Sequence, residues 1–269
     1  MYKEGMKEPN LRGKTALVTG GGRGIGRATA LALARCGAGL VLTARSQAQI
    51  EAVAEEIRAL GNEARAIRAD ISRQEDVEQL LEEAGSVDIL INNAGAIRPI
   101  APVAVVDPQE WLNNIAVNLH GPFLTCRYAL PGMLKRGWGR IINLSAGVAT
   151  GRMAAWSAYS AAKAGLETLT KVIAREVGDR GVRANVVRPG IVDTDMQAEI
   201  RETDERLFGR ENLERYRGYK ERGLLRDPED PAKLILWVLS PEADDLNGEI
   251  LAIDDPEVAA KIGLVPMGR

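Results

Sequence analysis

The sequence contains little cysteine and histidine, which limits the chemistry that its side chains can support. It has two cysteines, Cys36 and Cys126, and one histidine, His120. Both cysteines lie in segments with helical periodicity and lack metal-ligand spacing, so we expect reduced, buried thiols of a cytoplasmic protein. Because no second histidine or cysteine partner is available, no catalytic metal is expected, and His120 is assigned a structural role.

Long apolar runs and blocks of charge of one sign are also absent. No segment approaches the run of about eighteen apolar residues that a membrane span requires, and residues 1–10 lack the apolar core of an export signal. The 35 basic and 37 acidic residues are mixed along the chain, with a net charge of −2. This pattern argues against binding to nucleic acids or membrane surfaces.

What the sequence does contain is an alternation of short aliphatic runs with longer amphipathic segments. Its 269 residues, 45% of them hydrophobic, are enough for one domain over 1–269, with 1–10 as a loose N-terminal extension. Strands are predicted at 15–20, 39–44, 63–70, 88–95, 140–146, 183–190 and 248–254. Strands separated by helices indicate an α/β protein, a doubly wound Rossmann fold with a seven-stranded parallel sheet flanked by helices.

A glycine-rich turn follows the first predicted strand and opens a helix. It reads TGGGRGIG over residues 19–26. Gly20, Gly24 and Gly26 allow a tight turn and a close approach to a pyrophosphate, and the helix N-terminus directs free N–H groups at the anion. This order of strand, glycines and helix predicts a dinucleotide site.

The end of the second predicted strand indicates which dinucleotide is bound. An acidic residue there would hold the ribose 2′-hydroxyl of NAD, but this chain has Ala44 followed by Arg45. Arg45 can form paired hydrogen bonds with a 2′-phosphate, and Arg23 in the glycine turn could complete a two-arginine clamp. The sequence therefore favours NADP(H) as the cofactor.

Tyr159 and Lys163 stand four residues apart in the predicted helix SAYSAAKAGLETL. A tyrosine with an ordinary pKa of about 10 exchanges a proton at neutral pH only if its anion is stabilised. An ammonium group one turn away provides such stabilisation, and lowering the pKa by about three requires roughly 4 kcal/mol. Tyr159 is thus predicted to be a general acid in carbonyl reduction and a general base in alcohol oxidation.

Seven motifs in order give the chain, from about Lys14 to Asp255, its resemblance to a known family. They are TGGGRGIG, Asp70 with Ile71, NNAG at 92–95, Asn118 in VNLHGPF, Ser145 in IINLSA, YSAAK at 159–163 and RPGIVDT at 188–194. In these motifs and their spacing the sequence resembles the short-chain dehydrogenase/reductase family.

The resemblance implies a catalytic tetrad. Ser145 would bind and orient the substrate carbonyl, and Tyr159 would deliver the proton. Lys163 would lower the pKa of Tyr159 and hold the nicotinamide ribose. Asn118 would fix a helix distortion and, with Lys163, anchor a chain of water molecules that replenishes the proton.

The resemblance also implies the cofactor contacts. Asp70 and Ile71 would contact the adenine, Asn92 would support the sheet, and 189–194 would contact the nicotinamide. The full predicted set comprises Gly20, Gly22, Arg23, Gly24, Ile25, Gly26, Arg45, Asp70, Ile71, Asn93, Ala94, Gly95, Asn118, Tyr159, Lys163, Pro189, Gly190, Ile191, Val192 and Thr194.

The substrate side is predicted from residues 195–226, a charged and amphipathic segment that would form a lid. Its opening, with NGEILAIDD near the C-terminus, resembles the sepiapterin reductase and benzil reductase branch, which reduces small 1,2-dicarbonyl compounds and related ketones with NADPH. Ala252 stands where sepiapterin reductases have a pterin-anchoring aspartate, which favours a less polar ketone or diketone. Pocket candidates are Ile97, Val148, Arg152, Trp156 and Met196.

Two other functions fit the sequence. PGIVDTDM at 189–196 also suits a 3-oxoacyl-acyl-carrier-protein reductase, for which Arg152, Arg188 and Arg201 could form a basic patch that receives an acidic carrier protein. A catalytically silent NADP-binding regulator is the alternative of another class, and the intact tetrad argues against it.

Assembly is expected from the family and from an apolar stripe in LETLTKVIAREV, residues 166–177. In the family, the helix over 108–136 and the helix that begins near 156 pair with their symmetry mates. We expect a homotetramer or a homodimer.

Overall fold

In the computed structural model, which describes residues 7–151 and 153–265, seven parallel strands form one sheet. The strands are β1 (Thr15–Thr19), β2 (Gly39–Ala44), β3 (Ala64–Arg68), β4 (Ile89–Asn92), β5 (Gly139–Leu144), β6 (Val182–Arg188) and β7 (Ile250–Ala252). Their order across the sheet is β3-β2-β1-β4-β5-β6-β7. The predicted Rossmann fold is therefore confirmed.

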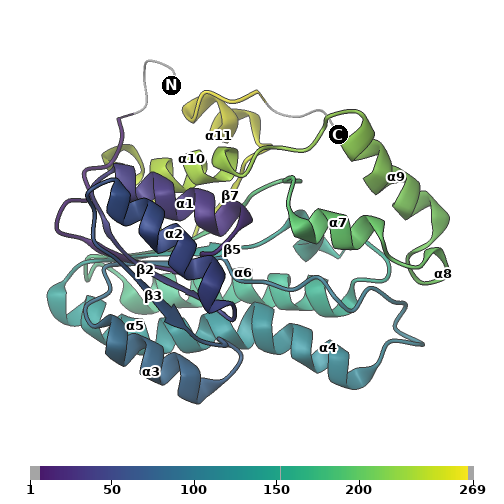
Figure 1. The fold of residues 1–269 in the computed structure, drawn as a ribbon, viewed down its shortest axis with the longest axis horizontal. Coiled ribbons are helices and arrows are strands. Elements are labelled where there is room, and N and C mark those ends of the chain that lie inside the picture. Colours follow the sequence, from purple (N-terminus) through teal and green to yellow (C-terminus); the bar gives the residue numbers. More distant parts are fainter. Residues whose placement is uncertain (1–6, 152, 266–269) are drawn as a thin grey trace.

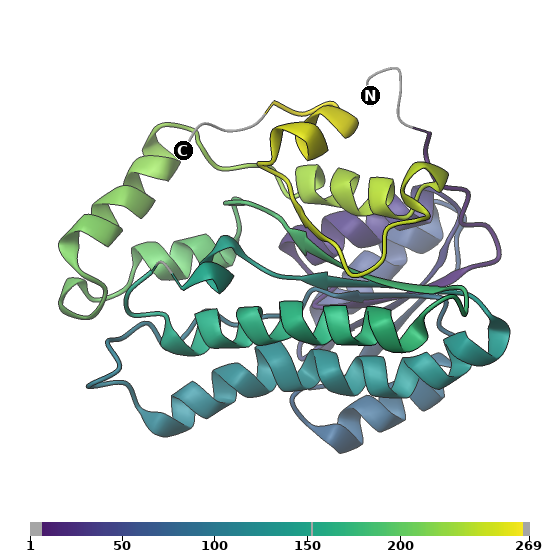
Figure 2. The same ribbon diagram turned by 180° about the vertical axis from the view of Figure 1, so that it is seen from behind.

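Helices cover both faces of the sheet (Figures 1 and 2). One face carries α1 (Gly24–Arg35), α2 (Gln47–Ala59) and α10 (Glu229–Val238). The other carries α3 (Gln74–Ala84), α4 (Pro108–Ile115), α5 (Gly121–Arg136) and α6 (Ser157–Val177). The last helix, α11 (Pro256–Lys261), lies near α10.

Successive side chains along the strands point to opposite faces of the sheet and form two apolar layers, one under each set of helices. In β1, Ala16 and Val18 face the layer of α1 and α10, whereas Leu17 between them faces the layer of α3 and α5. Ile89 and Leu90 of β4 divide in the same way. Because successive side chains of a strand point to opposite faces, strands buried on both sides are continuously apolar, as the sequence shows.

Some predicted strands extend too far at their carboxyl ends. The strand predicted at 88–95 ends at Asn92, because the amide N–H of Asn93 donates to the carbonyl of Ile91 at 3.1 Å and to Thr19 Oγ1 at 3.0 Å. The strand predicted at 248–254 spans only Ile250–Ala252. The residues beyond these strands leave the ladder and form loops around the cleft described below.

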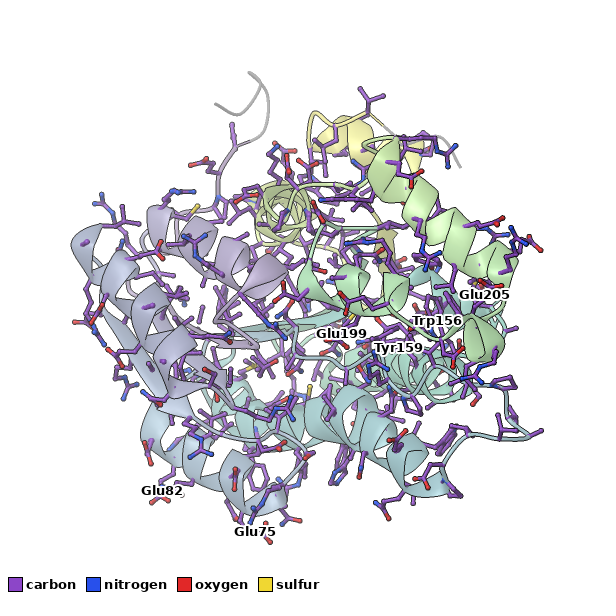
Figure 3. All side chains as sticks on the ribbon, turned by 45° about the vertical axis from the view of Figure 1, so that its right-hand side comes forward. Glu75, Glu82, Trp156, Tyr159, Glu199 and Glu205 are labelled. Atoms are coloured by element: carbon purple, nitrogen blue, oxygen red, sulfur yellow. The ribbon has the colours of Figure 1, made fainter. Side chains whose placement is uncertain are left out.

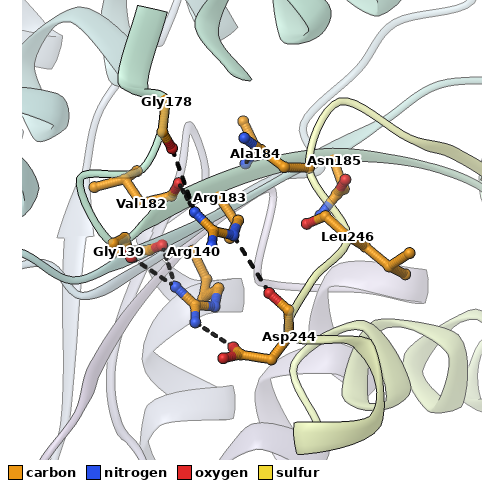
Figure 4. Close-up of polar contacts among 11 residues, drawn as sticks. Gly139, Arg140, Gly178, Val182, Arg183, Ala184, Asn185, Asp244 and Leu246 are labelled. Atoms are coloured by element: carbon orange, nitrogen blue, oxygen red, sulfur yellow. Dashed lines mark hydrogen bonds and ion pairs between the residues drawn. The ribbon is translucent and has the colours of Figure 1, made fainter. Parts of the chain in front are cut away.

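At the opposite edge, the amino ends of β5 and β6 are tied to the loop that precedes β7 (Figure 4). Arg140 forms an ion pair with Asp244 and donates to the carbonyls of Gly139 and Gly181, both at 2.9 Å. Arg183 donates to the carbonyl of Asp244 at 3.3 Å. These contacts hold the amino ends of β5 and β6 together.

The order of strands reverses between β1 and β4, since β2 and β3 extend to one side and β5 to β7 to the other. In open parallel sheets, ligands bind at the carboxyl ends of the strands where the order reverses. None of the described helices is both long and apolar enough to cross a membrane.

Candidate active site

A cleft of about 1480 Å³ lies at the carboxyl edge of the sheet. It is continuous from the glycine turn after β1 to Tyr159 on α6 and to the helices that follow β6. Small-molecule sites are usually concave and mostly apolar with a few polar groups, and this cleft has that character. It is the candidate active site.

The glycine turn is held by close backbone contacts. The amide N–H of Gly20 donates to the carbonyl of Thr43 at 2.8 Å, and the φ of Gly20 is +64°. A Cβ atom on Gly26 would lie 2.1 Å from the carbonyl oxygen of Gly20. Asn93 Nδ2 donates to the carbonyls of Thr19 and Gly20 at 2.9 and 3.2 Å. The turn therefore exposes the N-terminus of α1, where an anion would bind.

The two arginines predicted to clamp a 2′-phosphate have different surroundings. Arg45 is exposed beside the cleft at the end of β2, where its carbonyl accepts a 3.1 Å hydrogen bond from Arg68 Nε. Arg23 instead forms an exposed ion pair with Asp195 across the cleft. The guanidinium of Arg23 is thus paired with a carboxylate of the substrate side, whereas Arg45 forms no ion pair with the residues that the structure describes.

Tyr159 and Lys163 lie one turn apart on α6, and both are buried. Lys163 Nζ lies 5.6 Å from the centroid of the Tyr159 ring and donates to the carbonyl of Leu144 at 2.7 Å. That carbonyl ends β5, next to Ser145. Gly95 gives Asn118 room, because a Cβ atom at Gly95 would lie 2.9 Å from Asn118 Oδ1.

The expected lowering of the tyrosine pKa is not present in this structure. Burial raises the pKa of Tyr159 to about 12. Burial also lowers the pKa of Lys163 to about 8, and the nearby carboxylate of Glu167 opposes this shift. Burial disfavours both charged forms, so the ammonium loses its proton before the phenol does. Tyr159 is thus protonated at neutral pH, as a general acid must be.

Ser145 follows β5 and lines the cleft. Its amide N–H donates to the carbonyl of Val187 at 2.9 Å, which fixes its position beside β6. Its hydroxyl donates to Glu167 Oε1 at 2.7 Å. Glu167 in turn accepts from Arg188 Nε and Nη2, each at 2.7 Å. Glu167 was not predicted from the sequence, because it belongs to none of the motifs.

Asn118 lies in a π-helical turn, η1 (Ala116–His120), between α4 and α5. Asn118 Nδ2 donates to the carbonyl of Ala96 at 2.8 Å, and Asn118 Oδ1 accepts from the amide of Ala96 at 3.3 Å. Asn114 Nδ2 donates to the carbonyls of Ala96 and Arg98 at 2.9 and 2.7 Å. The two amides attach the loop after β4 to the distorted helix. Asn114 was missed from the sequence because an asparagine in a helix carries no motif of its own.

The substrate side of the cleft has an aromatic wall. It consists of Trp156, Tyr216 and Tyr219, which line the cleft, and Phe208, which packs behind them. The ring of Trp156 stacks on Phe208 with centroids 5.2 Å apart, and Tyr216 meets Trp156 edge to face at 5.6 Å. Figure 3 shows Trp156 and Tyr159 beneath the helices that follow β6. Such pairs favour apolar and aromatic ligands.

The segment after β6 leaves the sheet and comes back to the loop after β6 at Arg226. It forms α7 (Asp195–Arg201), α8 (Glu205–Phe208) and α9 (Arg210–Glu221). The amide of Arg226 donates to the carbonyl of Ile191, and the amide of Asp193 donates to the carbonyl of Arg226, both at 2.9 Å. The Arg226 side chain is 2% exposed and binds Asp254 at 2.7 Å. This ion pair holds the end of the segment that the sequence predicted to be a lid against the loop after β7.

Most of the predicted site residues line the cleft together. The cofactor residues that do so are Gly20, Gly22, Arg23, Gly24, Ile25, Arg45, Asp70, Ile71, Asn93, Ala94, Gly95, Tyr159, Lys163, Pro189, Gly190, Ile191, Val192 and Thr194. Gly26 and Asn118 lie behind the cleft wall, where they position other residues. Of the pocket candidates, Ile97, Val148, Trp156 and Met196 line the cleft, and Arg152 lies outside the described residues.

The comparisons with known proteins agree with this geometry. Residues 14–205 match the family model described as short chain dehydrogenase. The chain is 38% identical over 250 residues to the 3-oxoacyl-acyl-carrier-protein reductase FabG of Pseudomonas aeruginosa, covering 91% of this chain and 97% of the relative. It is also 38% identical to the FabG of Vibrio harveyi over 249 residues, with the same coverage. These relatives bear the name of the second enzyme that the sequence suggested, not of the sepiapterin and benzil reductase branch.

Solved structures are similar over nearly the whole chain. One, a proposed NAD(P)-dependent gluconate 5-dehydrogenase from Beutenbergia cavernae with bound NADP, has a TM-score of 0.82 and 32% identity, covering 93% of this chain and 98% of its own. A dehydrogenase/reductase from Sinorhizobium meliloti has a TM-score of 0.76 and 38% identity, covering 90% and 94%. On this evidence the chain is an oxidoreductase that belongs to the short-chain dehydrogenase/reductase family.

Proposed function

We propose that the chain is an NADP(H)-dependent oxidoreductase that reduces a small ketone or 1,2-diketone to an alcohol. The observation that carries the proposal is a buried tyrosine, Tyr159, between a dinucleotide cleft and an aromatic wall, with Lys163 one turn away. NADP(H) is supported by Arg45 at the end of β2 and by the bound NADP of the Beutenbergia structure.

In the proposed reaction, a ketone, NADPH and a proton give an alcohol and NADP⁺. Different residues of the chain have different roles in it. The bound nicotinamide supplies the hydride to the carbonyl carbon. Tyr159 transfers its proton to the carbonyl oxygen, and the Lys163 ammonium stabilises the phenolate that results. Ser145 positions the substrate, and Asn118 holds the loop after β4 against α5. Lys163 and Asn118 would anchor the water that returns the proton to Tyr159.

The substrate is proposed to be compact and mainly apolar. Trp156 and Tyr216 border the space beside Tyr159, and Ala252 presents a methyl group to the cleft. The nearby carboxylate of Asp254 is already bound by Arg226. A pterin would find no free hydrogen-bonding anchor at Ala252, which supports the preference for less polar ketones.

A 3-oxoacyl-acyl-carrier-protein reductase is the second candidate, supported by the names of relatives at 38% identity. Of the three arginines expected to form its basic patch, Arg152 lies outside the described residues. Arg188 is bound to Glu167 and faces inward, with a side chain 23% exposed. In Arg201, Nη1 is buried without a hydrogen-bond partner among the described residues. Because of the names of these relatives, a thioester is tested together with the ketones.

The test of the proposed function is NADPH oxidation measured with matched substrates. We expect a higher kcat/KM with aryl ketones and 1-phenyl-1,2-propanedione than with an acetoacetyl thioester. A thioester that is reduced tenfold more efficiently than every ketone would replace the proposal by the second candidate. NADPH binding without any oxidation across the panel would favour the regulator that the sequence also allowed.

Arg45→Ala is expected to lower kcat/KM for NADPH by about 10- to 100-fold and to leave that for NADH within about threefold. The reason is that a charge-assisted hydrogen bond to a phosphate contributes roughly 1.5–3 kcal/mol. Steady-state kinetics with both cofactors measures the ratio. Arg58→Ala, which removes an arginine bound to Glu51 on α2, is the control and should change neither value. Equal losses with both cofactors would contradict the role of Arg45.

The reduction rate is expected to fall as the pH rises through about 8. In the folded chain the pKa of Lys163 is lowered to about 8, so its ammonium is present below that pH and lost above it. The pKa of Tyr159, raised to about 12, leaves its proton in place over this range. A pH profile of kcat/KM reports the groups of the free enzyme. A profile that stays flat to pH 10 would contradict the assignment to Lys163.

We also propose a homodimer or homotetramer. Leu112 on α4, Phe123 on α5 and Val172 on α6 are exposed by 55%, 44% and 44%. They lie on the helical layer that the sequence predicted to pair with its symmetry mates. Sedimentation at micromolar concentration should give two or four times the mass of 29.0 kDa. A single monomeric species would contradict the proposal.

A further inference from the structure

Tyr216 on α9 is a buried tyrosine of the aromatic wall that takes no part in the proton transfer from Tyr159. It lines the cleft, and only 8% of the residue is exposed. Its ring meets Trp156 edge to face at 5.6 Å, and the ring of Tyr159 meets the same indole edge to face at 6.3 Å. The two phenols, on α9 and α6, therefore border one tryptophan and belong to one apolar cluster.

The hydroxyls of Tyr159 and Tyr216 are both open to the cleft. Neither forms a hydrogen bond with any of the residues that the structure describes, and neither is enclosed by protein, whereas Trp156 Nε1 is enclosed without a partner. A ligand can therefore reach the two phenols but not the indole N–H. Burial raises the pKa of Tyr216, and the neighbouring phenols of Tyr219 and Tyr159 raise it further, which places the Tyr159 hydroxyl within electrostatic range.

The hydroxyl of Tyr216 makes the cleft discriminate between ligands. Water can bind it while the cleft is open, and a ligand that enters displaces this water. A plain ketone has a single acceptor oxygen, which binds Tyr159, so its alkyl arm would leave the buried hydroxyl of Tyr216 without a partner. A site that offers such a hydroxyl rejects a ligand that cannot pair with it. A ligand with a second acceptor oxygen beside the first avoids this loss.

We propose that Tyr216 is a specificity-determining residue that donates a hydrogen bond to the second oxygen of a 1,2-diketone while Tyr159 donates to the carbonyl that is reduced. Because the two phenols border the same indole, the two acceptor oxygens must lie close together, as they do on adjacent carbon atoms. The flat π-system of an aryl diketone also suits an aromatic wall. The inference rests on the proposed carbonyl reduction and selects one of its two substrate classes.

The chemistry changes only one of the two carbonyl groups. NADPH gives its hydride to one carbonyl carbon, Tyr159 gives its proton to the oxygen of that carbonyl, and NADP⁺ and a hydroxyketone result. The second carbonyl keeps its bonds and remains a hydrogen-bond acceptor for Tyr216. The product is therefore an α-hydroxyketone.

The test compares 1-phenyl-1,2-propanedione with propiophenone, in which a methylene group replaces the second carbonyl. The measured quantity is the ratio of their kcat/KM values with NADPH. In Tyr216→Phe, which removes one oxygen atom and keeps the ring against Trp156, we expect this ratio to fall at least about tenfold relative to the parent. The intrinsic reactivity of the diketone contributes equally in both enzymes and cancels. If NMR of the product shows that the carbonyl beside the methyl group is reduced, phenylacetone takes the place of propiophenone.

Tyr219→Phe is the matched control. Tyr219 lies one turn from Tyr216 on α9 and lines the same cleft, but its ring partner is Tyr216, at 5.5 Å, instead of Trp156. Whatever its absolute rates, its ratio should stay within about twofold of the parent. NADPH titration of both variants should give dissociation constants within about threefold of the parent, because the glycine turn and Arg45 are unchanged.

An unchanged ratio in Tyr216→Phe would overturn the inference, as would an equal fall in Tyr219→Phe. In both cases the parent still reduces carbonyl compounds, so the proposed function stands. If Tyr216→Phe does not fold, Tyr216→Met is measured by the same ratio, because its flexible side chain fills an apolar site without a hydroxyl. A parent that oxidises NADPH with neither compound overturns the proposed function itself.

Discussion

Tyr159→Phe is expected to lower kcat for ketone reduction by about 10²- to 10⁴-fold, the usual contribution of a positioned acid. The substitution removes one oxygen atom and keeps the ring that packs against Trp156 at 6.3 Å. Hydride transfer would then leave an alkoxide without a proton source in a buried site.

Two measurements accompany this variant. NADPH titration should give a dissociation constant within about threefold of the parent, because the glycine turn and Arg45 are unchanged. Tyr128→Phe, which removes a hydroxyl bound to Gln74 on the outer helical layer, should retain the parent kcat. A Tyr159→Phe variant that binds NADPH and keeps more than a third of the parent kcat would exclude Tyr159 as the proton donor.

Gly26→Ala is expected to abolish NADPH binding at concentrations that saturate the parent. The new Cβ atom would lie 2.1 Å from the Gly20 carbonyl oxygen and 2.6 Å from Asn93 Nδ2. The Gly20 carbonyl belongs to the turn that presents its N–H groups to the pyrophosphate, and Asn93, which follows β4, holds that turn through the carbonyls of Thr19 and Gly20. Relief of the clash must therefore open the turn. Overpacking of this kind typically costs about 1–3 kcal/mol in the free energy of unfolding.

Calorimetry and NADPH titration check this prediction. For a chain of this size, each kcal/mol lost from the free energy of unfolding lowers the Tm by about 2–4 °C, so the Tm should fall by several degrees. Gly218→Ala is the matched control, because a Cβ atom there would meet Arg222 at an ordinary 3.7 Å in the middle of α9. It should bind NADPH as the parent does and gain slightly in stability. Normal NADPH binding by Gly26→Ala would contradict the role assigned to the turn.

Much of the fold could be predicted from local signals in the sequence. Runs such as TALVT and GRIINL are apolar at every position because both faces of the sheet are covered, and this pattern belongs to parallel sheets. The glycine turn could be found because its φ values and close contacts permit few other residues. Tyr159, Lys163 and Ser145 were predicted from their order and spacing, and all three line the cleft.

What the sequence did not reveal depends on pairs of residues that are distant in the chain. Glu167 lies 21 residues before Arg188, and Arg226 lies 28 residues before Asp254, so neither pair forms a motif. In the same way, the sequence did not reveal the exposed ion pair between Arg23 and Asp195. The pKa of Tyr159 was predicted from the nearby charge alone, whereas burial has the larger effect.

The aromatic wall could not be predicted from the sequence for the same reason. The chain contains only eleven phenylalanine, tryptophan and tyrosine residues, and four of them meet in this wall. One is the N-cap of α6, and the other three lie on α8 and α9. From the sequence, Trp156 was a pocket candidate, but Phe208 and Tyr216 were two apolar positions in a charged amphipathic segment. Only the return of the chain at Arg226 brings the lid helices over the cleft.

The most direct test of carbonyl reduction in this cleft is isotope transfer. The purified chain is incubated with an aryl ketone and with NADPH in which deuterium replaces both hydrogens at C4 of the nicotinamide. The product is then analysed by mass spectrometry. The account predicts an alcohol with one deuterium on the carbinol carbon, formed by the parent and at most at a hundredth of that rate by Tyr159→Phe. Bound NADPH that remains unoxidised with every ketone and thioester would contradict it.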